Sequence, residues 1–494
     1  GSVQILGEVV SHSQVSRQQL QDSGSRIADS MPESVTRYLI KTGNRDFAAP
    51  DFRTLLSSDI RQRQKPQEII VLQRRSGGNA YGWFAGLRDG TQPLVAQNMD
   101  QALQQRLLQI RLQLQQAAHI RRVEMAQVNA QLEALHQQAQ ELREEKQYGA
   151  QEQSIHQADR AELQRQFNNL ATRLASLNNE MERSALLLRD ASGQLQRIPL
   201  TQIVAAWHPN AMTLGQKWQH FATQIWHFIS DSPGEYQADG GAFPAIFGTV
   251  LMVLLMSVVV MPLGVIAAVW LHEYADRNAL TRLVRIAVVN LAGVPSIVYG
   301  VFGLGFFVWL IGGSLDQLFF PASLPNPTFG TPGLLWASLT LALLTLPVVI
   351  VATEEGLSRI PAALRQGSLA LGATRAETLW HITLPLAIPA MLTGLILAVS
   401  RAAGETAPLM LVGVVKLAPE LPIDAIFPYL HLDRKFMHLG FQIYDLAFQS
   451  TNAEAERPLV YATALLLVSI VLGLNLVAMG LRHRLRERYR ALVQ

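Results

Sequence analysis

The chain has 494 residues, which is enough for several domains, and its formal net charge of +3 is too small to indicate nucleic-acid binding. It contains no cysteine, so disulfide bonds, thiolate metal sites and a thiol nucleophile are excluded. Residues 1 to about 240 are polar and rich in glutamine, whereas leucine, valine, isoleucine, alanine and glycine dominate from about residue 242 onward. The sequence therefore predicts a mainly α-helical protein with a polar half followed by a membrane-embedded half.

Residues 1–99 have the pattern of a small α+β domain. Short runs with strand character are separated by glycine-containing turn signals, and they cover residues 3–10, 68–75, 79–90 and 92–99. Two other stretches, 34–47 and 52–63, are predicted to be short helices.

Residues 100–195 are predicted to form a long antiparallel coiled-coil hairpin. Apolar residues recur there at alternating spacings of three and four, and the register slips once between Ala117 and Met125. The break QYGAQ (147–151) divides the stretch into two arms of roughly 40 residues, each about 60 Å long as a helix. A hairpin closed within one chain and pairing with a second chain both satisfy this pattern, and a spacer is the plainest role for it.

Residues 196–240 are predicted to lead back to the membrane through a strand at 198–210 and an amphipathic helix at 217–231. One face of that helix carries Trp218, Phe221, Ile225, Phe228 and Ile229, with Trp226 suited to the membrane–water interface. His220 and His227 are better explained as solvated side chains than as metal ligands, and no metal site is predicted.

Residues 241–482 contain apolar runs long enough to cross a bilayer. They lie at about 244–271, 286–312, 333–352, 386–414 and 459–481. Buried helices of a large soluble protein are the alternative, but five such runs argue against it. Five arginines between Arg482 and Arg490 predict a basic cytoplasmic tail at 483–494.

The loops between these runs differ in positive charge, which predicts their orientation. Loops 272–285 and 353–385 and the C-terminal tail carry arginines, whereas loop 313–332 has neither lysine nor arginine. Loop 415–457 has mixed charge and weakens the contrast slightly. Because positive charge is enriched on cytoplasmic loops, we expect the C-terminus in the cytoplasm and the polar half outside. Export of that half requires a signal or a preceding membrane helix, so we expect one to be missing from this chain.

Residues 354–385 have the features of a docking projection. Pro361 fits the start of a short helix at 362–371, Gly372 can break it, and a second helix is predicted at 374–382. Two short helices at an angle form a projection that a groove on a partner can hold. An ordinary polar loop is the alternative.

Arg401 and Glu405 lie four residues apart in the fourth apolar run, and therefore on one helical face. An unpaired charge near the middle of a span costs at least ~2.5–3.5 kcal/mol, so we expect the two to pair. A purely structural pair is one interpretation. The other is a substrate pathway that includes Thr406, because the planar donors of a guanidinium suit an oxyanion such as phosphate. Glu405 would then hold Arg401 and keep the site from binding too tightly.

Residues 354–385 resemble the coupling loop of bacterial ABC-importer permeases, which has Glu-Ala-Ala, three residues, Gly, nine residues and Ile-x-Leu-Pro. The resemblance implies that ATPase subunits dock on this loop, at Gln366, Gly367, Ser368, Ala370, Leu371, Gly372, Ala373, Thr374, Ile382, Leu384 and Pro385. Gln366 stands where the family has glutamate, so a salt bridge made by that glutamate cannot be carried over.

Further motifs between about residues 240 and 481 resemble the PstA family of phosphate permeases. They are GGAFPAIFGTV (240–250), GVPSIVYGVFGLG (293–305), LTLPVVIVATEEGL (344–357), LALGAT (369–374) and GETAP (404–408). The resemblance implies the type I ABC importer fold in a bacterial inner membrane, with six spans in family members and a periplasmic insertion after the first. Close helix packing or a pathway lining is then the role of Gly293, Pro295, Ser296 and Gly300.

The same resemblance implies the partners. They are a second, PstC-like permease, two PstB-like ATP-binding subunits and a PstS-like periplasmic phosphate-binding protein. The chain has no G-x-x-x-x-G-K-[ST] sequence, so a partner has to bind ATP, and neither a cofactor nor a catalytic residue is expected here. The alternatives are a PstC-like subunit, a permease for sulfate, molybdate or tungstate, and a membrane sensor or scaffold.

Overall fold

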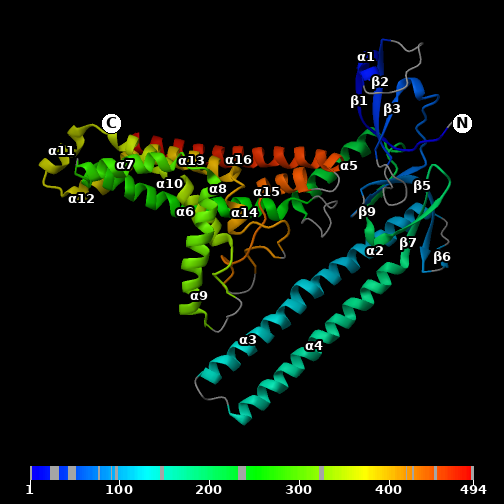
Figure 1. Ribbon diagram of the computed structural model, residues 1–494, viewed down its shortest axis with the longest axis horizontal. Helices are drawn as coiled ribbons and strands as arrows, with labels where there is room; N and C mark the ends of the chain where they lie inside the picture. Colours follow the sequence, from blue (N-terminus) through cyan, green and yellow to red (C-terminus); the bar gives the residue numbers. More distant parts are fainter. Residues whose placement is uncertain are drawn as a thin grey trace. The chain divides into compact units, whose positions relative to one another are not determined.

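The computed structural model describes residues 3–22, 33–42, 52–75, 78–90, 92–94, 98–144, 149–231, 241–276, 278–321, 327–418, 420–424, 428–449 and 453–490. Its ribbon is drawn in Figure 1. The chain divides into two compact units. The N-terminal unit comprises Gly1–Ile229 and Pro233–Gly241, and the C-terminal unit comprises Ser230–Ser232 and Ala242–Gln494.

Among its described residues, the N-terminal unit contains two antiparallel sheets. The smaller sheet has the order β1-β2-β3, formed by Glu8–Ser16, Ser34–Lys41 and Phe52–Leu56, and a short helix, α1 (Arg17–Asp22), follows β1. The larger has the order β8-β7-β5-β4-β9, with β6 beside β5. Its strands are β4 (Ile69–Arg74), β5 (Ala80–Asp89), β6 (Gln92–Leu94), β7 (Ser184–Arg189), β8 (Leu195–Pro199) and β9 (Ile203–Trp207).

The helices predicted at 34–47 and 52–63 are wrong in the described residues, which form β2, β3 and a single 3-10 turn at Ser57–Asp59. Val35, Tyr38 and Ile40 are β-branched or aromatic, which favours strand over helix. Cross-strand pairing on both sides of β2 then decides the outcome. Residues 43–47 of the first prediction lie outside the described residues.

Three long helical segments follow in the N-terminal unit, α2 (Met99–His119), α3 (Met125–Glu144) and α4 (Ala150–Arg183). A π-helical turn at Ile120–Glu124 joins α2 to α3, and it coincides with the slip of the apolar register in the sequence. Figure 1 shows α3 and α4 side by side, and residues of the two helices are in contact. Residues 147 and 148 of the predicted break lie outside the described residues, α4 begins within the break at Ala150, and coiled-coil geometry stays a prediction.

The core of the N-terminal unit lies between the larger sheet and the adjoining ends of α2 and α4. It consists of buried side chains from both, among them Ile70, Leu72, Leu186, Leu188, Ile198, Leu103, Leu107, Ile110 and Met181. The helix α5 (Leu214–Ser230) follows β9 and overlaps the predicted amphipathic helix.

In the C-terminal unit, the described residues contain five helices long and apolar enough to cross a membrane. They are Phe243–Tyr274, Ser296–Phe319, Leu334–Ser358, Arg375–Gly404 and Glu456–Arg484. The helical elements of this unit are α6 (Phe243–Val269), α7 (Ala279–Leu291), α8 (Ser296–Phe302), α9 (Gly313–Phe319), α10 (Leu334–Ser358), α11 (Ala362–Ala370), α12 (Arg375–Thr378), α13 (Leu384–Gly404), α14 (Leu409–Val412), α15 (Leu439–Tyr444) and α16 (Ala453–Arg490). Stretches of π-helix extend α6 and α15 and join α8 to α9 and α12 to α13.

Two predicted spans have the wrong ends. The sequence predicts the second at 286–312, but α7 ends at Leu291 and a new helix begins at Ser296, because Pro295 disfavours helical geometry in the residue before it. The fourth was placed at 386–414, but its helix begins at Arg375 and ends at Gly404. Arg401 therefore lies in the last turn of α13 and not near the middle of a span.

Glycines allow the central spans to approach each other closely. A Cβ at Gly264 of α6 would lie 2.6 Å from Val349 of α10, and one at Gly394 of α13 would lie 2.8 Å from Ala352. Small residues are what such helix contacts in a membrane require. The spans α6, α10 and α13 thus form the packed centre of the C-terminal unit, around the buried residues Met256, Leu341 and Ala398.

Candidate functional site

The pair predicted in the fourth run is formed. Nε of Arg401 lies 3.4 Å from Oε1 of Glu405, and the two side chains are 35% and 20% exposed. Arg401 is in the last turn of α13, where a positive charge also interacts favourably with the helix dipole. Glu405 ends the helix, because its backbone is extended, with ψ of 128°.

The segment from Glu405 to Val412, here called the elbow, turns the chain after α13. The carbonyl of Thr406 accepts hydrogen bonds from the amides of Leu409 and Met410, at 3.1 and 3.2 Å. A Cβ on Gly300 of α8 would lie 2.7 Å from Cα of Pro408, so α8 is in close contact with the elbow. The structure therefore brings Arg401, Glu405, Thr406 and Gly300 of the predicted site together.

The other three predicted packing residues shape the start of α8. The amide of Gly293 donates to the carbonyl of Asn290 at 3.0 Å in the turn that ends α7. Pro295 is the N-cap of α8 and Ser296 is its first residue. They therefore define where the second span begins, at the start of the helix that carries Gly300.

A second element packs on the elbow, and sequence reasoning did not single it out. A Cβ on Gly440 of α15 would meet Oγ1 of Thr406, and the neighbouring amide of Leu439 donates to Oγ1 of Thr249 in α6 at 3.0 Å. His438 is buried beside them, and its Nδ1 accepts the amide of Gly440 at 3.1 Å. His438 lies outside the five spans, and burial lowers its pKa to about 4, so the imidazole is neutral. No periodicity marks this histidine in the sequence.

Residues 354–385 contain the first predicted short helix as α11, while the second is continuous with the fourth span through a π-helical segment. Gln366, Gly367, Ser368 and Ala370 lie on α11, Ile382 lies in the π-helical segment, and Leu384 and Pro385 begin α13. The hydroxyls of Ser368 and Thr378 are 2.9 Å apart and join α11 to α12.

The turn between α11 and α12 uses residues with specific backbone roles. Gly372 has φ of +92°, which residues with a Cβ rarely adopt. Thr374 and Glu377 form a reciprocal capping box at the start of α12. Next to them, Leu371 is 91% exposed, and Leu364, Leu369 and Trp380 are also exposed apolar side chains. Such a surface is typical of a protein-docking site.

Ion pairs connect this loop to the first span, and the sequence did not predict them. Nη1 of Arg365 on α11 lies 2.8 Å from Oε1 of Glu273 at the end of the first span. Arg365 also donates to the carbonyl of Leu357 at 2.7 Å. Nearby, Arg285 of α7 lies 2.8 Å from Glu354 of α10. Arg365 therefore ties α11 to the end of the first span and to α10.

Comparison with known proteins decides the family. The profile described as "Binding-protein-dependent transport system inner membrane component" matches residues 260–491. The "Probable ABC transporter permease protein YqgI" of Bacillus subtilis is 30% identical over 256 residues, which cover 51% of this chain and 81% of that protein. The chain belongs to this family of inner-membrane transport components. It is therefore an integral inner-membrane protein, and its relatives are named as transport permeases.

Other relatives carry more specific names. The "Phosphate transport system permease protein PstA 1" of Mycobacterium tuberculosis H37Rv is 32% identical over 255 residues, 51% of this permease and 73% of that protein. The PstA protein of Mycobacterium leprae is 32% identical over 284 residues, 57% of this permease and 81% of that protein. An inward-facing structure of the MetNI methionine ABC transporter covers 56% of this permease and all but 1% of its own chain, at 17% identity and a TM-score of 0.33. The last likeness is too weak to add to the assignment.

Proposed function

We propose that this permease is the PstA-type subunit of an ATP-driven importer of inorganic phosphate. Two arguments support phosphate: the names of the mycobacterial relatives, and the guanidinium of Arg401 held at the end of α13 by one carboxylate. The Arg401–Glu405 pair carries the proposal, because its guanidinium can bind an oxyanion next to the elbow on which α8 and α15 pack.

The pair can bind phosphate and release it again. Arg401 contacts Glu405 through Nε, and its terminal amino groups Nη1 and Nη2 supply the planar donors for a tetrahedral oxyanion. Glu405 has the same sign of charge as phosphate and competes for the guanidinium. This competition lowers the affinity, so that phosphate leaves when the pathway opens to the other side.

One helix connects the proposed docking surface for the ATP-binding subunits to Arg401. Two ATP-binding subunits would dock on loop 354–385, at the exposed side chains of Leu369, Leu371 and Trp380. The helix that begins at Arg375 beside this surface ends at Gly404, three residues beyond Arg401. Movement of the docked subunits would therefore shift Arg401 along with the loop, and the Arg365–Glu273 pair would carry the first span with it.

The orientation and the remaining partners follow from the loop charges and the family resemblance. Loop 354–385 and the C-terminus would face the cytoplasm and the N-terminal unit the periplasm. A PstC-like permease would complete the pathway, and a PstS-like binding protein would deliver phosphate. Within residues 100–195, α2 to α4 would form a coiled-coil hairpin closed within one chain. The hairpin would be inserted in an α+β domain whose larger sheet takes strands from both sides of it, β4 to β6 before and β7 to β9 after.

The test is uptake by the purified complex in proteoliposomes, with phosphate, sulfate and molybdate offered separately. We expect phosphate uptake, and we expect Arg401→Ala to abolish it while the complex still assembles. Arg401→Lys keeps the charge but loses the planar donors, so we expect only partial uptake. Arg282→Ala, at an exposed arginine of α7 outside loop 354–385, is the matched control and should transport normally.

Three results would overturn parts of this proposal. Normal phosphate uptake by Arg401→Ala would remove Arg401 from the pathway. Uptake of sulfate or molybdate in preference to phosphate would establish one of the other oxyanions as the substrate. If no solute is taken up by an intact, ATP-hydrolysing complex, the sensor or scaffold alternative replaces transport.

A further inference from the structure

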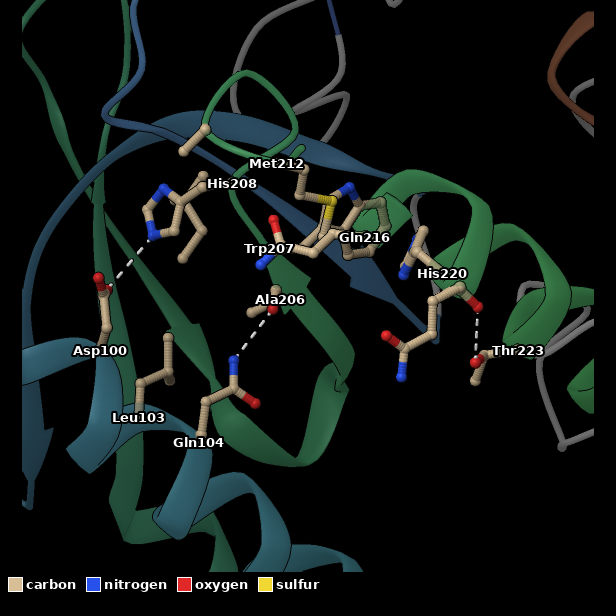
Figure 2. Close-up of a pocket in the computed structure, with 13 residues that line it drawn as sticks. Asp100, Leu103, Gln104, Ala206, Trp207, His208, Met212, Gln216, His220 and Thr223 are labelled. Carbon is tan, nitrogen blue, oxygen red and sulfur yellow. Dashed lines mark hydrogen bonds and ion pairs between the residues drawn. The ribbon is translucent and has the colours of Figure 1, made fainter. Parts of the chain in front are cut away.

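Helix α5 turns its polar side toward the rest of the N-terminal unit. The ring of His220 lies 4.7 Å from that of Trp207 in β9, and Nε2 of Gln224 donates to Oε1 of Gln73 in β4 at 3.4 Å. Gln216, His220 and Thr223 line a groove of about 520 Å³ whose other side is formed by α2 and β9, as Figure 2 shows. No residue of the predicted transport site lines this groove.

The apolar side of α5 is exposed. It consists of Leu214, Trp218, Phe221, Ile225, Trp226 and Ile229. Trp218 is 70% exposed and Trp226 is 67% exposed. A surface helix of a water-soluble domain normally packs its apolar face on the core, so this orientation is the reverse of the usual one. The exposed face therefore needs an apolar partner.

The C-terminal end of α5 is held next to the start of the first span. Ser230, the last residue of α5, already belongs to the C-terminal unit. The carbonyl of the next residue, Asp231, accepts a hydrogen bond from the amide of Phe243 at 3.2 Å. Phe243 is the first residue of the first membrane-spanning helix. Because consecutive Cα atoms are about 3.8 Å apart, α5 ends within a few residues' reach of the membrane boundary.

The composition of α5 matches a helix that lies on a bilayer. Its 17 residues are fewer than the roughly 20 of a typical span, and one side is polar, whereas a span is predominantly apolar all round. Tryptophan, which occurs twice on α5, is enriched where hydrocarbon meets headgroups. Lys217 is the only lysine or arginine on the helix, so burial of apolar side chains, more than attraction to anionic lipid, would supply the binding energy.

We propose that α5 lies in the plane of the bilayer surface, with its apolar side in the boundary between lipid headgroups and acyl chains. The partner of this surface is lipid. The helix thereby anchors the N-terminal unit beside the point where the chain enters the membrane. This role does not depend on which solute is transported.

The absence of cysteine makes the test direct, because one introduced cysteine carries one spin label. Phe221→Cys and Ile225→Cys place labels on the apolar side, and Gln219→Cys and Thr223→Cys place them on the groove side. Leu195→Cys is the matched control, since Leu195 in β8 is also an exposed apolar residue of the N-terminal unit. The full chain in proteoliposomes is then measured for collisions with oxygen, which concentrates in lipid, and with a water-soluble nickel chelate.

We expect the labels at 221 and 225 to collide several-fold more with oxygen than with the nickel chelate, relative to the label at 195. The labels at 219 and 223 should not share this preference. Nickel collisions at 221 and 225 equal to those at 195 would overturn the proposal. Shielding of these positions from both reagents would also overturn it, because a protein surface would then cover the helix. Two positions on each side keep the comparison valid if one variant fails to fold.

Discussion

The helix from Arg375 to Gly404 is bordered by two turns that are built differently. The turn before it, at 371–374, is closed by its own residues: Gly372 with its positive φ, and the capping box of Thr374 and Glu377. The elbow after it is positioned by residues far away in the sequence. Gly300 contacts Pro408, and Gly440 contacts Thr406.

This difference suits the roles proposed for the two ends. A turn closed by local contacts keeps its shape while it moves with a docked partner. An elbow held by α8 and α15 changes its environment whenever those helices shift. Substitutions can therefore distinguish the roles of the two turns. Those at the elbow should disturb the packing of several spans, whereas those at the first turn should disturb only the coupling of ATP hydrolysis to transport.

The largest effect is expected at Gly300. A Cβ there would lie 2.7 Å from backbone of Pro408, which cannot yield as a flexible side chain would. Gly300→Val should therefore destabilise the C-terminal unit by about 3 kcal/mol or more, at the upper end of overpacking effects. The measurement is the thermal midpoint of the purified permease, together with phosphate uptake.

The matched control is Gly305→Val, because a Cβ at Gly305 has no described atom within 4 Å. We expect this variant to keep both stability and uptake. Equal thermal midpoints and equal uptake in the two variants would show that neither stability nor transport needs the close approach of α8 to the elbow.

Acid should act on the elbow through His438. Its pKa is lowered from 6.5 to about 4 by burial, so between these values the unfolded chain binds a proton that the folded chain does not. Stability should therefore be unaffected by His438 above pH 6.5 and should fall as the pH drops toward 4. The loss amounts to about 1.4 kcal/mol per pH unit, or roughly 3 kcal/mol in all.

The comparison is between the pH dependence of thermal midpoints for the original chain and for His438→Gln. The variant should show a shallower loss between pH 6.5 and 4, whatever its stability at neutral pH. His483→Gln, at a histidine 73% exposed, should leave the slope unchanged. An unchanged slope in His438→Gln would mean that the histidine is hydrated or already protonated.

The difference between a turn closed by its own residues and an elbow held by distant helices also explains what could be predicted from the sequence. Gly372 and Pro361 act on their immediate neighbours, so the short helix at 362–371 was placed within one residue of α11. The elbow was predicted as a continuation of the span, because the apolar run extends past Gly404 and composition alone does not show that the helix ends there. Pro408 is a signal against that continuation, since proline seldom occurs in the interior of a helix.

His438 and the Arg365–Glu273 pair could not have been found in this way. The burial of His438 depends on the packing of α15 on α6, and Arg365 and Glu273 are far apart in the sequence until α11 packs on the first span. The strands β2 and β3 were missed for a similar reason, since pairing across the sheet outweighed the local helical pattern.

A smaller effect is expected at Gly372. Its φ of +92° is strained for any residue with a Cβ, at about 1–2 kcal/mol. Gly372→Val should therefore distort the loop and reduce uptake and motor-stimulated ATP hydrolysis several-fold, with an unchanged thermal midpoint for the spans. Gly480→Ala lies in α16, outside the docking loop, where a Cβ has no described atom within 4 Å, and should transport normally. Full transport by Gly372→Val would end the assignment of this turn to docking.

The smallest effect concerns the pair that joins the loop to the first span, and it sharpens the contrast between the two turns. Arg365→Ala and Glu273→Gln, alone and combined, form a double-mutant cycle. The pair is 2.8 Å apart and about three-quarters buried on both sides, so we expect a coupling of about 1 kcal/mol in stability. Arg359 and Glu355, 3.7 Å apart and largely exposed, should give a coupling close to zero.

If the Arg365–Glu273 pair transmits motion as proposed, both of its single variants should also reduce uptake per ATP hydrolysed, an effect that stability alone would not produce. Equal coupling in the two cycles, with uptake per ATP unchanged, would leave the loop as a turn that moves without carrying the first span.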